Sequence, residues 1–174
     1  MSTAWIALAG YMGAGKTTVG RRLAARLGRP FADADRLVED HAGMPIPEIF
    51  SRRGEVWFRR TEEDIVRETL AGPPGVIALG GGALGSARTR DLLGRTARVV
   101  WLRLDPEAAW HRVGGSEHRP LAQDRERFLR RAAQRAPLYR EAADLEVDAA
   151  HPPEEVADRI AAWAAQREAQ AVEG

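Results

Sequence analysis

A short stretch after the first apolar run of the chain has the composition of a phosphate-binding loop. Residues 10–17, with the sequence GYMGAGKT, complete the pattern G-x-x-x-x-G-K-[ST]. The glycines allow the backbone to curl so that successive N–H groups and the positive end of the next helix face a polyphosphate. Lys16 would bring a compact charge to the β- and γ-phosphates, and the Thr17 hydroxyl would be a ligand for Mg²⁺. The alternative is a glycine-rich turn beside an ordinary helix, but it does not explain why both glycines, the lysine and the threonine occupy the fixed positions of the motif.

Lys16 is the only lysine among 26 basic residues. The chain also has 25 Asp and Glu residues, so its net charge is +1. An ammonium group fits inside a curled loop and donates to several oxygens, whereas a planar guanidinium is bulkier and more directional. The near-neutral charge argues against a general nucleic-acid binder. The absence of cysteine excludes disulfides, Cys-ligated metals and a thiol nucleophile. The apolar run 4–10 is too short to span a bilayer, so we expect a soluble cytoplasmic protein.

Two aspartates follow the second apolar stretch, in the segment FADAD at residues 31–35. Residues two apart in an extended chain point to the same side, so Asp33 and Asp35 would project together at the carboxyl end of a strand. Ligands bind at that end of an open α/β sheet. One carboxylate could hold the metal through water, and the other could accept from a substrate hydroxyl or act as its general base. Equally, Asp35 could cap a helix that begins at Arg36, with Asp33 in the preceding turn.

Three consecutive glycines, Gly80, Gly81 and Gly82, follow the apolar stretch 76–79. Such a triplet allows a ligand to lie against bare backbone and accept hydrogen bonds from N–H groups, whereas a plain turn needs only one or two glycines. Two guanidinium groups that are brought together could hold a carboxylate, although sequence spacing does not show which arginines meet. Arg59 and Arg135 are candidates for that pair, although ordinary surface positions are the alternative for each.

Other arginines surround a segment with the composition of a loop. Arg112 and Arg119 flank Gly114-Gly115, and an arginine on a closing loop can neutralise charge on a transferring phosphoryl group. The segment from about 113 to 124 has the length of a lid, a binding loop or a disordered stretch. The arginine doublets, including Arg130-Arg131, alternate with acidic residues and indicate mostly solvated helix faces.

These residues need a scaffold, and apolar β-type runs alternate with amphipathic stretches along the chain. The expected strands are residues 4–9, 31–33, 76–79, 99–104 and 145–147, and helical spacing is found at 17–27, 56–70 and 153–166. This alternation predicts an α/β fold with a parallel sheet and helices on both faces, in one domain over residues 1–174. Residues 36–71 are expected to be helical, which is long for a single crossover, and Pro137 is expected to end a helix.

Taken together, the segments GYMGAGKTTVGRRL, DAD, GEVWFRRTEE, ALGGGA, HRPL and RAPLY resemble the shikimate kinase family in order and spacing. A phosphate loop alone would leave many families open, whereas D-x-D, F-R-x-x-E, G-G-G and R-P-L together are specific to this one. The resemblance implies transfer of the γ-phosphoryl of ATP to the 3-hydroxyl of shikimate, in aromatic amino acid biosynthesis, by a monomeric cytoplasmic enzyme. It also implies a three-layer P-loop kinase fold with a five-stranded parallel sheet of order 2-3-1-4-5.

The resemblance assigns a role to each matching residue. The catalytic set would be Lys16, Asp35 and Arg119. ATP would be bound by Gly13, Ala14, Gly15, Lys16, Thr17, Thr18, Arg112 and Arg119, with Arg112 over the adenine and Arg119 reaching the phosphates from the lid. Mg²⁺ would be held by Thr17 and, through water, by Asp33. Shikimate would be bound by Asp35, Arg59, Gly80, Gly81, Gly82 and Arg135, with Glu62 orienting Arg59. Residues 35–71 would form the substrate-binding subdomain and residues 113–124 the lid.

Two other functions stay open at this point. One is another small-metabolite kinase of the same fold, such as a gluconate or nucleotide kinase, and the other is a non-catalytic nucleotide-binding regulator. Asp35 together with the glycine triplet and the two arginines favours a compact polyhydroxy acid as substrate. The complete set of phosphate-loop, acidic and lid residues argues against a regulator. We expect small molecules, ATP with Mg²⁺ and the acid substrate, as partners, and neither nucleic acid nor membrane.

Overall fold

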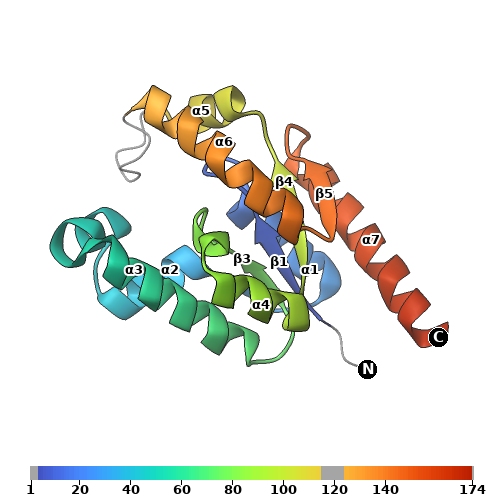
Figure 1. The fold of residues 1–174 in the computed structure, drawn as a ribbon. Helices are drawn as coiled ribbons and strands as arrows, with labels where there is room; N and C mark the ends of the chain where they lie inside the picture. Colours follow the sequence, from blue (N-terminus) through green and yellow to red (C-terminus); the bar gives the residue numbers. More distant parts are fainter. Residues whose placement is uncertain (1–3, 115–123, 174) are drawn as a thin grey trace.

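Five strands form one parallel sheet in the computed structural model, which describes residues 4–114 and 124–173 (Figure 1). The strands are β1 Trp5–Ala9, β2 Phe31–Asp33, β3 Val76–Ala78, β4 Ala97–Arg103 and β5 Leu145–Asp148. Their order across the sheet is β2-β3-β1-β4-β5, and each neighbouring pair is parallel. The α/β class and the 2-3-1-4-5 order are therefore confirmed, and each strand lies within two residues of its expected bounds.

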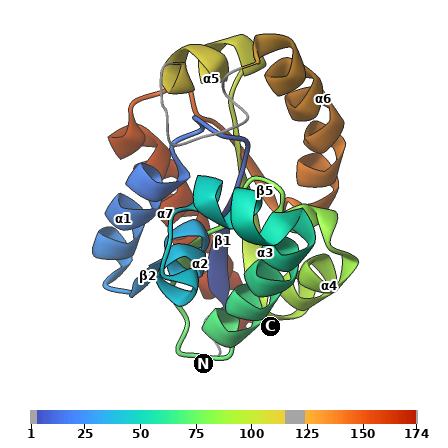
Figure 2. The same cartoon turned by 90° about the vertical axis from the view of Figure 1, so that its left-hand side faces the viewer.

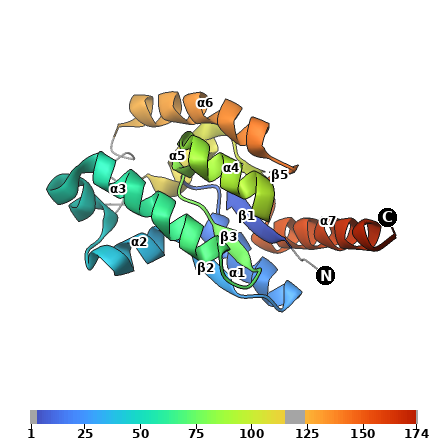
Figure 3. The same ribbon diagram turned by 60° about the horizontal axis from the view of Figure 1, so that its bottom comes forward.

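Helices cover both faces of this sheet and give the fold three layers (Figures 1 and 2). They are α1 Lys16–Leu27, α2 Ala34–Ala42, α3 Ile46–Leu70, α4 Ala87–Thr96, α5 Pro106–Val113, α6 Arg125–Ala142 and α7 Pro153–Glu173, with a short 3₁₀ turn, η1, at Ala83–Gly85. Side chains alternate along β1, so that Trp5 and Ala7 pack on the side of α3, α4, α5 and α6, and Ile6 and Leu8 pack on the side of α1 and α7. The end of α7 extends beyond the sheet (Figure 3).

The helical region between β2 and β3 has a small apolar cluster of its own. Val38 of α2 packs with Ile49 and Phe58 of α3, and all three side chains are buried. The α3 segment breaks at Gly54, whose φ of 81° lies in the left-handed region that favours glycine. This break separates two helical stretches and turns the residues after Gly54 back toward the sheet (Figure 1). The expected helical stretch is confirmed, except that residues 43–45 separate α2 from α3 and that α3 bends at Gly54.

One open alternative and one expectation about helix ends are wrong. Asp35 does not cap α2, because the helix begins at Ala34 and Asp33 is the cap, with its Oδ1 accepting from the Arg36 N–H at 3.3 Å. Pro137 does not end α6, which continues through it to Ala142. A proline inside a helix removes one main-chain donor and costs about 3 kcal/mol. Burial of the Phe128 and Tyr139 side chains on either side of Pro137 offsets that cost.

The loops that carry the candidate residues meet at one edge of the sheet. The carboxyl ends of parallel strands lie together, so the residues that follow β1, β2 and β3 become neighbours although they are far apart in the chain. Asp105, two residues after the end of β4, caps α5 through the N–H groups of Glu107 and Ala108. No helix in the described part of the chain has both the length and the apolar composition to cross a membrane.

Candidate active site

The loop between β1 and α1 has the curled backbone that the phosphate-loop motif requires. Gly10 and Gly13 have φ values of 153° and 85°, and a Cβ on either would lie 2.8 Å from a main-chain oxygen, that of Leu102 or of Ala109. The loop is therefore tightly seated against β4 and α5, and only glycine fits at these positions. Gly15, also with positive φ, is the N-cap of α1, so the N-terminus of that helix lies at the loop.

The Lys16 ammonium lies inside this curl. Its Nζ donates to the Gly10 carbonyl at 2.7 Å and to the Tyr11 carbonyl at 3.2 Å. A pocket of about 370 Å³ opens beside it. Its walls are Gly13, Gly15, Lys16, Thr17, Thr18, Asp33, Asp35, Ala78, Leu79, Arg112 and Val113. Most of the residues expected to bind ATP and the metal therefore face one pocket. Ala14 does not line it, because its side chain is buried and its N–H closes a turn with the Tyr11 carbonyl at 3.2 Å.

Thr17 and Asp33 form a pair that fits a hard cation. The Thr17 hydroxyl donates to Asp33 Oδ2 at 2.6 Å, which leaves the lone pairs of its oxygen available to a metal. Mg²⁺ in nucleotide sites takes one or two protein oxygens and completes its shell with water and phosphate. These two oxygen donors on the pocket wall thus suit Mg²⁺ bound together with a nucleotide.

A second pocket, of about 500 Å³, adjoins the first. Lys16, Thr17, Asp33 and Asp35 line both pockets, and the second is completed by Met12, Arg21, Arg36, Glu39, Ile46, Phe50, Glu55, Phe58, Arg59, Glu62, Gly81, Gly82, Arg131 and Arg135. Asp35 therefore lies where the two spaces meet. Both aspartates face the pockets, as we expect. However, Asp35 lies in the first turn of α2 and not in an extended strand, so the alternation of side chains along a strand does not explain its position.

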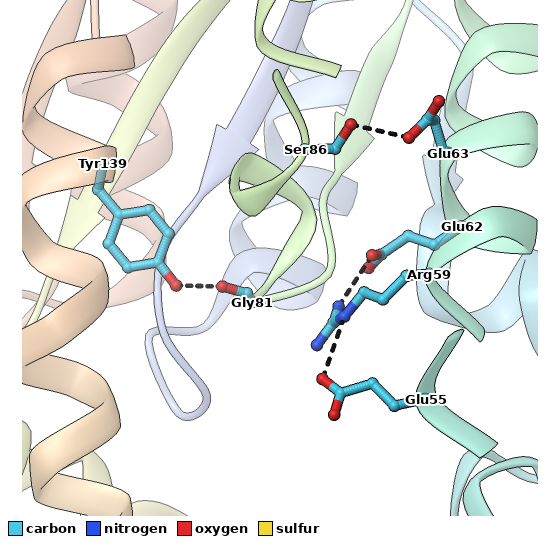
Figure 4. Close-up of polar contacts among 7 residues, drawn as sticks. All are labelled: Glu55, Arg59, Glu62, Glu63, Gly81, Ser86 and Tyr139. Atoms are coloured by element: carbon cyan, nitrogen blue, oxygen red, sulfur yellow. Dashed lines mark hydrogen bonds and ion pairs between the residues drawn. The ribbon is translucent and has the colours of Figure 1, made fainter. Parts of the chain in front are cut away.

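The second pocket brings together the two arginines that sequence spacing left apart. Arg59 extends from α3, where its Nη1 lies 2.9 Å from Glu62 Oε2 and its Nε lies 3.6 Å from Glu55 Oε1 (Figure 4). Arg135 extends from α6, and its guanidinium lies 5.3 Å from the centre of the Tyr11 ring. Both guanidinium groups border the same space, with Gly81 and Gly82 between their helices. Two arginines in such an arrangement can bind a carboxylate.

The glycine triplet is closely surrounded by the side chains of the site. None of the three has a positive φ, but a Cβ on Gly80 would lie 2.2 Å from Glu62 Oε1, and one on Gly82 would lie 2.5 Å from Arg59 Nη2. The site's own side chains thus occupy part of the bare backbone that we expected a ligand to use. Gly80 is buried behind Glu62, and Gly81 and Gly82 line the second pocket.

Glu62 is a buried carboxylate at the base of this site. Its side chain is 4% exposed, and Oε1 has no hydrogen-bond partner among the described residues. Burial raises the pKa of Glu62 above its usual range, and the nearby Arg59 guanidinium lowers that pKa by less. The Glu62 carboxylate holds Arg59 in place through their ion pair. Because burial disfavours the charged form, ionisation of Glu62 is unfavourable for folding.

We expect the free energy of unfolding of the natural protein to fall, relative to that of Glu62→Gln, as the pH rises above 4.5. Above this pH the unfolded chain loses the Glu62 proton while the folded state still retains it, so the stability that is fully present below pH 4.5 decreases. The advantage is lost as the pH rises through the raised pKa. Urea unfolding at a series of pH values measures the difference. Glu68→Gln, on an exposed part of the same helix, is the matched control, and parallel curves for the protein and Glu62→Gln would contradict the prediction.

Three further arginines differ in their relation to the two pockets. Arg112 faces the first pocket and donates to the Gly13 carbonyl at 3.2 Å and to the Ala149 carbonyl at 3.1 Å, so it joins the phosphate loop to the loop after β5. Arg119 and the rest of the expected lid from residue 115 to 123 lie outside the described residues. Arg131 was not expected at the site. It lines the second pocket, while its neighbour Arg130 pairs with Glu126 at the exposed surface.

A helix signal could have identified Arg131. It precedes Arg135 by four residues, and residues four apart lie on the same face of a helix. Of the Arg130-Arg131 doublet, only Arg130 is therefore the surface residue that we expect.

Comparison with known proteins agrees with this geometry. The sequence profile described as "Shikimate kinase" matches residues 12–165. The shikimate kinase of Symbiobacterium thermophilum is 46% identical over 147 residues, covering 82% of this chain and 84% of that protein. That of Moorella thermoacetica is 42% identical over 164 residues, covering 91% and 95%. The structure of Acinetobacter baumannii shikimate kinase in complex with shikimate superimposes with a TM-score of 0.87 at 39% identity, covering 91% of each chain. The chain belongs to the shikimate kinase family.

Proposed function

We propose that the protein transfers the γ-phosphoryl group of ATP directly to the 3-hydroxyl of shikimate, without a covalent enzyme intermediate. The observation that carries the proposal is the junction of the two pockets, where Lys16 and Asp35 face both spaces. A phosphate donor in the first pocket and a hydroxyl acceptor in the second would meet between them. Positioning and charge stabilisation account for most of the catalysis of phosphoryl transfer.

The first pocket has the groups that a nucleotide requires. Gly13, Gly15 and the N-terminus of α1 offer main-chain donors to the phosphates, and Thr18 lies at the pocket wall. Thr17 and Asp33 would hold the Mg²⁺ of the nucleotide, which when bound withdraws charge from the phosphate oxygens. Arg112 would lie over the adenine.

The second pocket has the groups that a small polyhydroxy acid requires. Arg59 and Arg135 would bind the carboxylate, and the backbone at Gly81 and Gly82 would contact the hydroxyl groups. Asp35 would accept a hydrogen bond from the reacting hydroxyl and remove its proton as the phosphoryl group transfers. Residues 35–71 would form the substrate-binding subdomain, and Arg119 would reach the phosphates from a lid at 113–124. The resemblance to the family also supports a monomeric enzyme in the cytoplasm.

The test of this function is ADP release measured with and without shikimate. We expect release that depends on shikimate and on Mg²⁺, with little release for gluconate or a nucleoside monophosphate at the same concentration. Turnover of one of those acceptors in place of shikimate would assign the protein to another small-metabolite kinase. Tight ATP binding with no turnover of any acceptor would indicate a nucleotide-binding regulator.

Arg59→Ala is expected to raise the KM for shikimate by about 10- to 100-fold, with a much smaller change in kcat. A charge-assisted hydrogen-bonded pair contributes about 1.5–3 kcal/mol, and the carboxylate is bound equally before and during transfer. Steady-state kinetics with saturating ATP measure the effect. Arg60→Ala is the matched control, because it removes the same charge from the exposed neighbouring position. An unchanged KM in Arg59→Ala would show that this arginine does not bind the carboxylate.

A further inference from the structure

Tyr139 lies at the glycine turn, and the mechanism above gives it no role. It is on α6, four residues after Arg135, and is 3% exposed. Its hydroxyl donates a hydrogen bond to the Gly81 carbonyl (Figure 4). A link between α6 and the loop after β3 thus ends at the backbone that faces the substrate pocket.

The hydrogen bond determines which way one peptide group faces. The carbonyl oxygen and the amide hydrogen of a trans peptide point in opposite directions, so a Gly81 carbonyl directed at Tyr139 turns the Gly82 N–H away from Tyr139. Gly82 borders Arg59 and lines the second pocket. The other two carbonyls of the triplet also have partners, since Gly80 accepts from the Ala83 N–H and Gly82 from the Gly85 N–H, both at 3.0 Å.

This peptide needs an external constraint because it joins two glycines. Glycine residues on both sides of a peptide allow either orientation at little cost. The far end of the turn is held to α3, where the Ser86 hydroxyl lies 2.8 Å from Glu63 Oε2 (Figure 4). Tyr139 supplies the second point of attachment, on the opposite side. A flipped peptide would direct a carbonyl, instead of an N–H donor, at the hydroxyls of the substrate.

Tyr139 is suited to be a permanent donor. Burial raises the pKa of its hydroxyl, more than the nearby Arg135 guanidinium lowers it, so the group keeps its proton at any working pH. Its ring is held independently, 6.0 Å from the centre of the Trp101 ring. A Cβ on Gly81 would lie 3.2 Å from Arg135 Nη1 and 3.8 Å from the Tyr139 oxygen, so the hydroxyl and the guanidinium border the same residue.

We propose that Tyr139 is a positioning residue for shikimate, resting on the function proposed above. Its hydroxyl locks the Gly81–Gly82 peptide with the N–H of Gly82 toward the substrate, next to the arginine pair. It touches neither ATP nor the reacting atoms, and its effect is confined to acceptor binding.

The test is Tyr139→Phe, which removes the hydroxyl and retains the ring that packs on Trp101. We expect the KM for shikimate to rise about 10-fold, as for one lost hydrogen bond, with the KM for ATP unchanged within about twofold and kcat reduced much less than KM rises. The matched control is Thr96→Val. It also removes a hydroxyl that donates to a main-chain carbonyl, that of Leu92 at 2.8 Å, but it lies just before β4 at the opposite edge of the sheet.

The outcomes separate positioning from general stability. A rise in the shikimate KM in Tyr139→Phe alone, with similar urea midpoints for the two variants, supports the proposal. An unchanged shikimate KM, or equal rises in the KM for both substrates, overturns it. Wild-type turnover is measured first, because its absence refutes the proposed function and this inference together, whereas wild-type turnover with an unaffected Tyr139→Phe refutes this inference alone.

Discussion

Asp35→Asn is expected to lower kcat for shikimate phosphorylation by about 10²- to 10⁴-fold, the usual contribution of a general base. Asp35 lies at the boundary of the two pockets, on the first turn of α2. Asparagine has nearly the same shape and retains an oxygen that accepts a hydrogen bond from the substrate, but it cannot take up the proton. The KM for ATP should stay within about twofold, because the phosphate loop and the Thr17–Asp33 pair are unaltered.

The size of the loss distinguishes a base from a group that only orients the hydroxyl. An orienting group would be replaced well by asparagine, so a loss in kcat of less than about tenfold would contradict the assignment of Asp35 as the base. Asp40→Asn is the matched control. It makes the same change on the same helix, at an exposed position where Asp40 pairs with Arg36 at 3.1 Å. Steady-state assays with both substrates saturating give the comparison.

Residues whose positions follow from local rules were predicted from the sequence. The phosphate loop and its strand and helix are adjacent in the chain. One motif, the apolar run before it and the helical spacing of apolar residues after it are therefore enough to predict them. The parallel sheet follows from the alternation of strands and helices. The same reasoning failed at Asp35 and Pro137, because in both places tertiary packing and capping, rather than local propensity, set the helix ends.

Contacts between distant segments were not accessible to that reasoning. The packing of Glu62 against Gly80, and of Arg59 against Gly82, joins α3 to the loop after β3, and nothing in either segment indicates the distance between them. Only family resemblance pointed to Glu62. No sequence pattern indicates the role of the Tyr139 hydroxyl either, since its partner is a main-chain carbonyl 58 residues away. Sequence patterns describe side chains, and the orientation of a single peptide is visible only in the fold.

Lys16→Ala is expected to lower kcat by about 10²- to 10³-fold, the cost of removing one preorganised group that stabilises charge in the transition state. The ammonium is held by the Gly10 and Tyr11 carbonyls inside the curl of the loop. Lys16→Arg should restore little of the lost activity, because a guanidinium is bulkier and more directional than the ammonium that this curl accommodates. Arg22→Ala, which removes a positive charge from α1 at an exposed ion pair with Glu154, should leave kcat unchanged.

The single lysine allows the same group to be tested without mutation. Lys16 and the N-terminal amine are the only primary amines that the sequence provides. An amine-directed reagent should therefore modify Lys16 and abolish activity, and ATP with Mg²⁺ should protect both the residue and the activity, as followed by mass spectrometry. Because arginines do not react, the N-terminal amine is the one other position that the reagent can modify, and mass spectrometry distinguishes it from Lys16. Modification of Lys16 with full activity retained, or at a rate that ATP does not change, would show that this ammonium does not bind the phosphates.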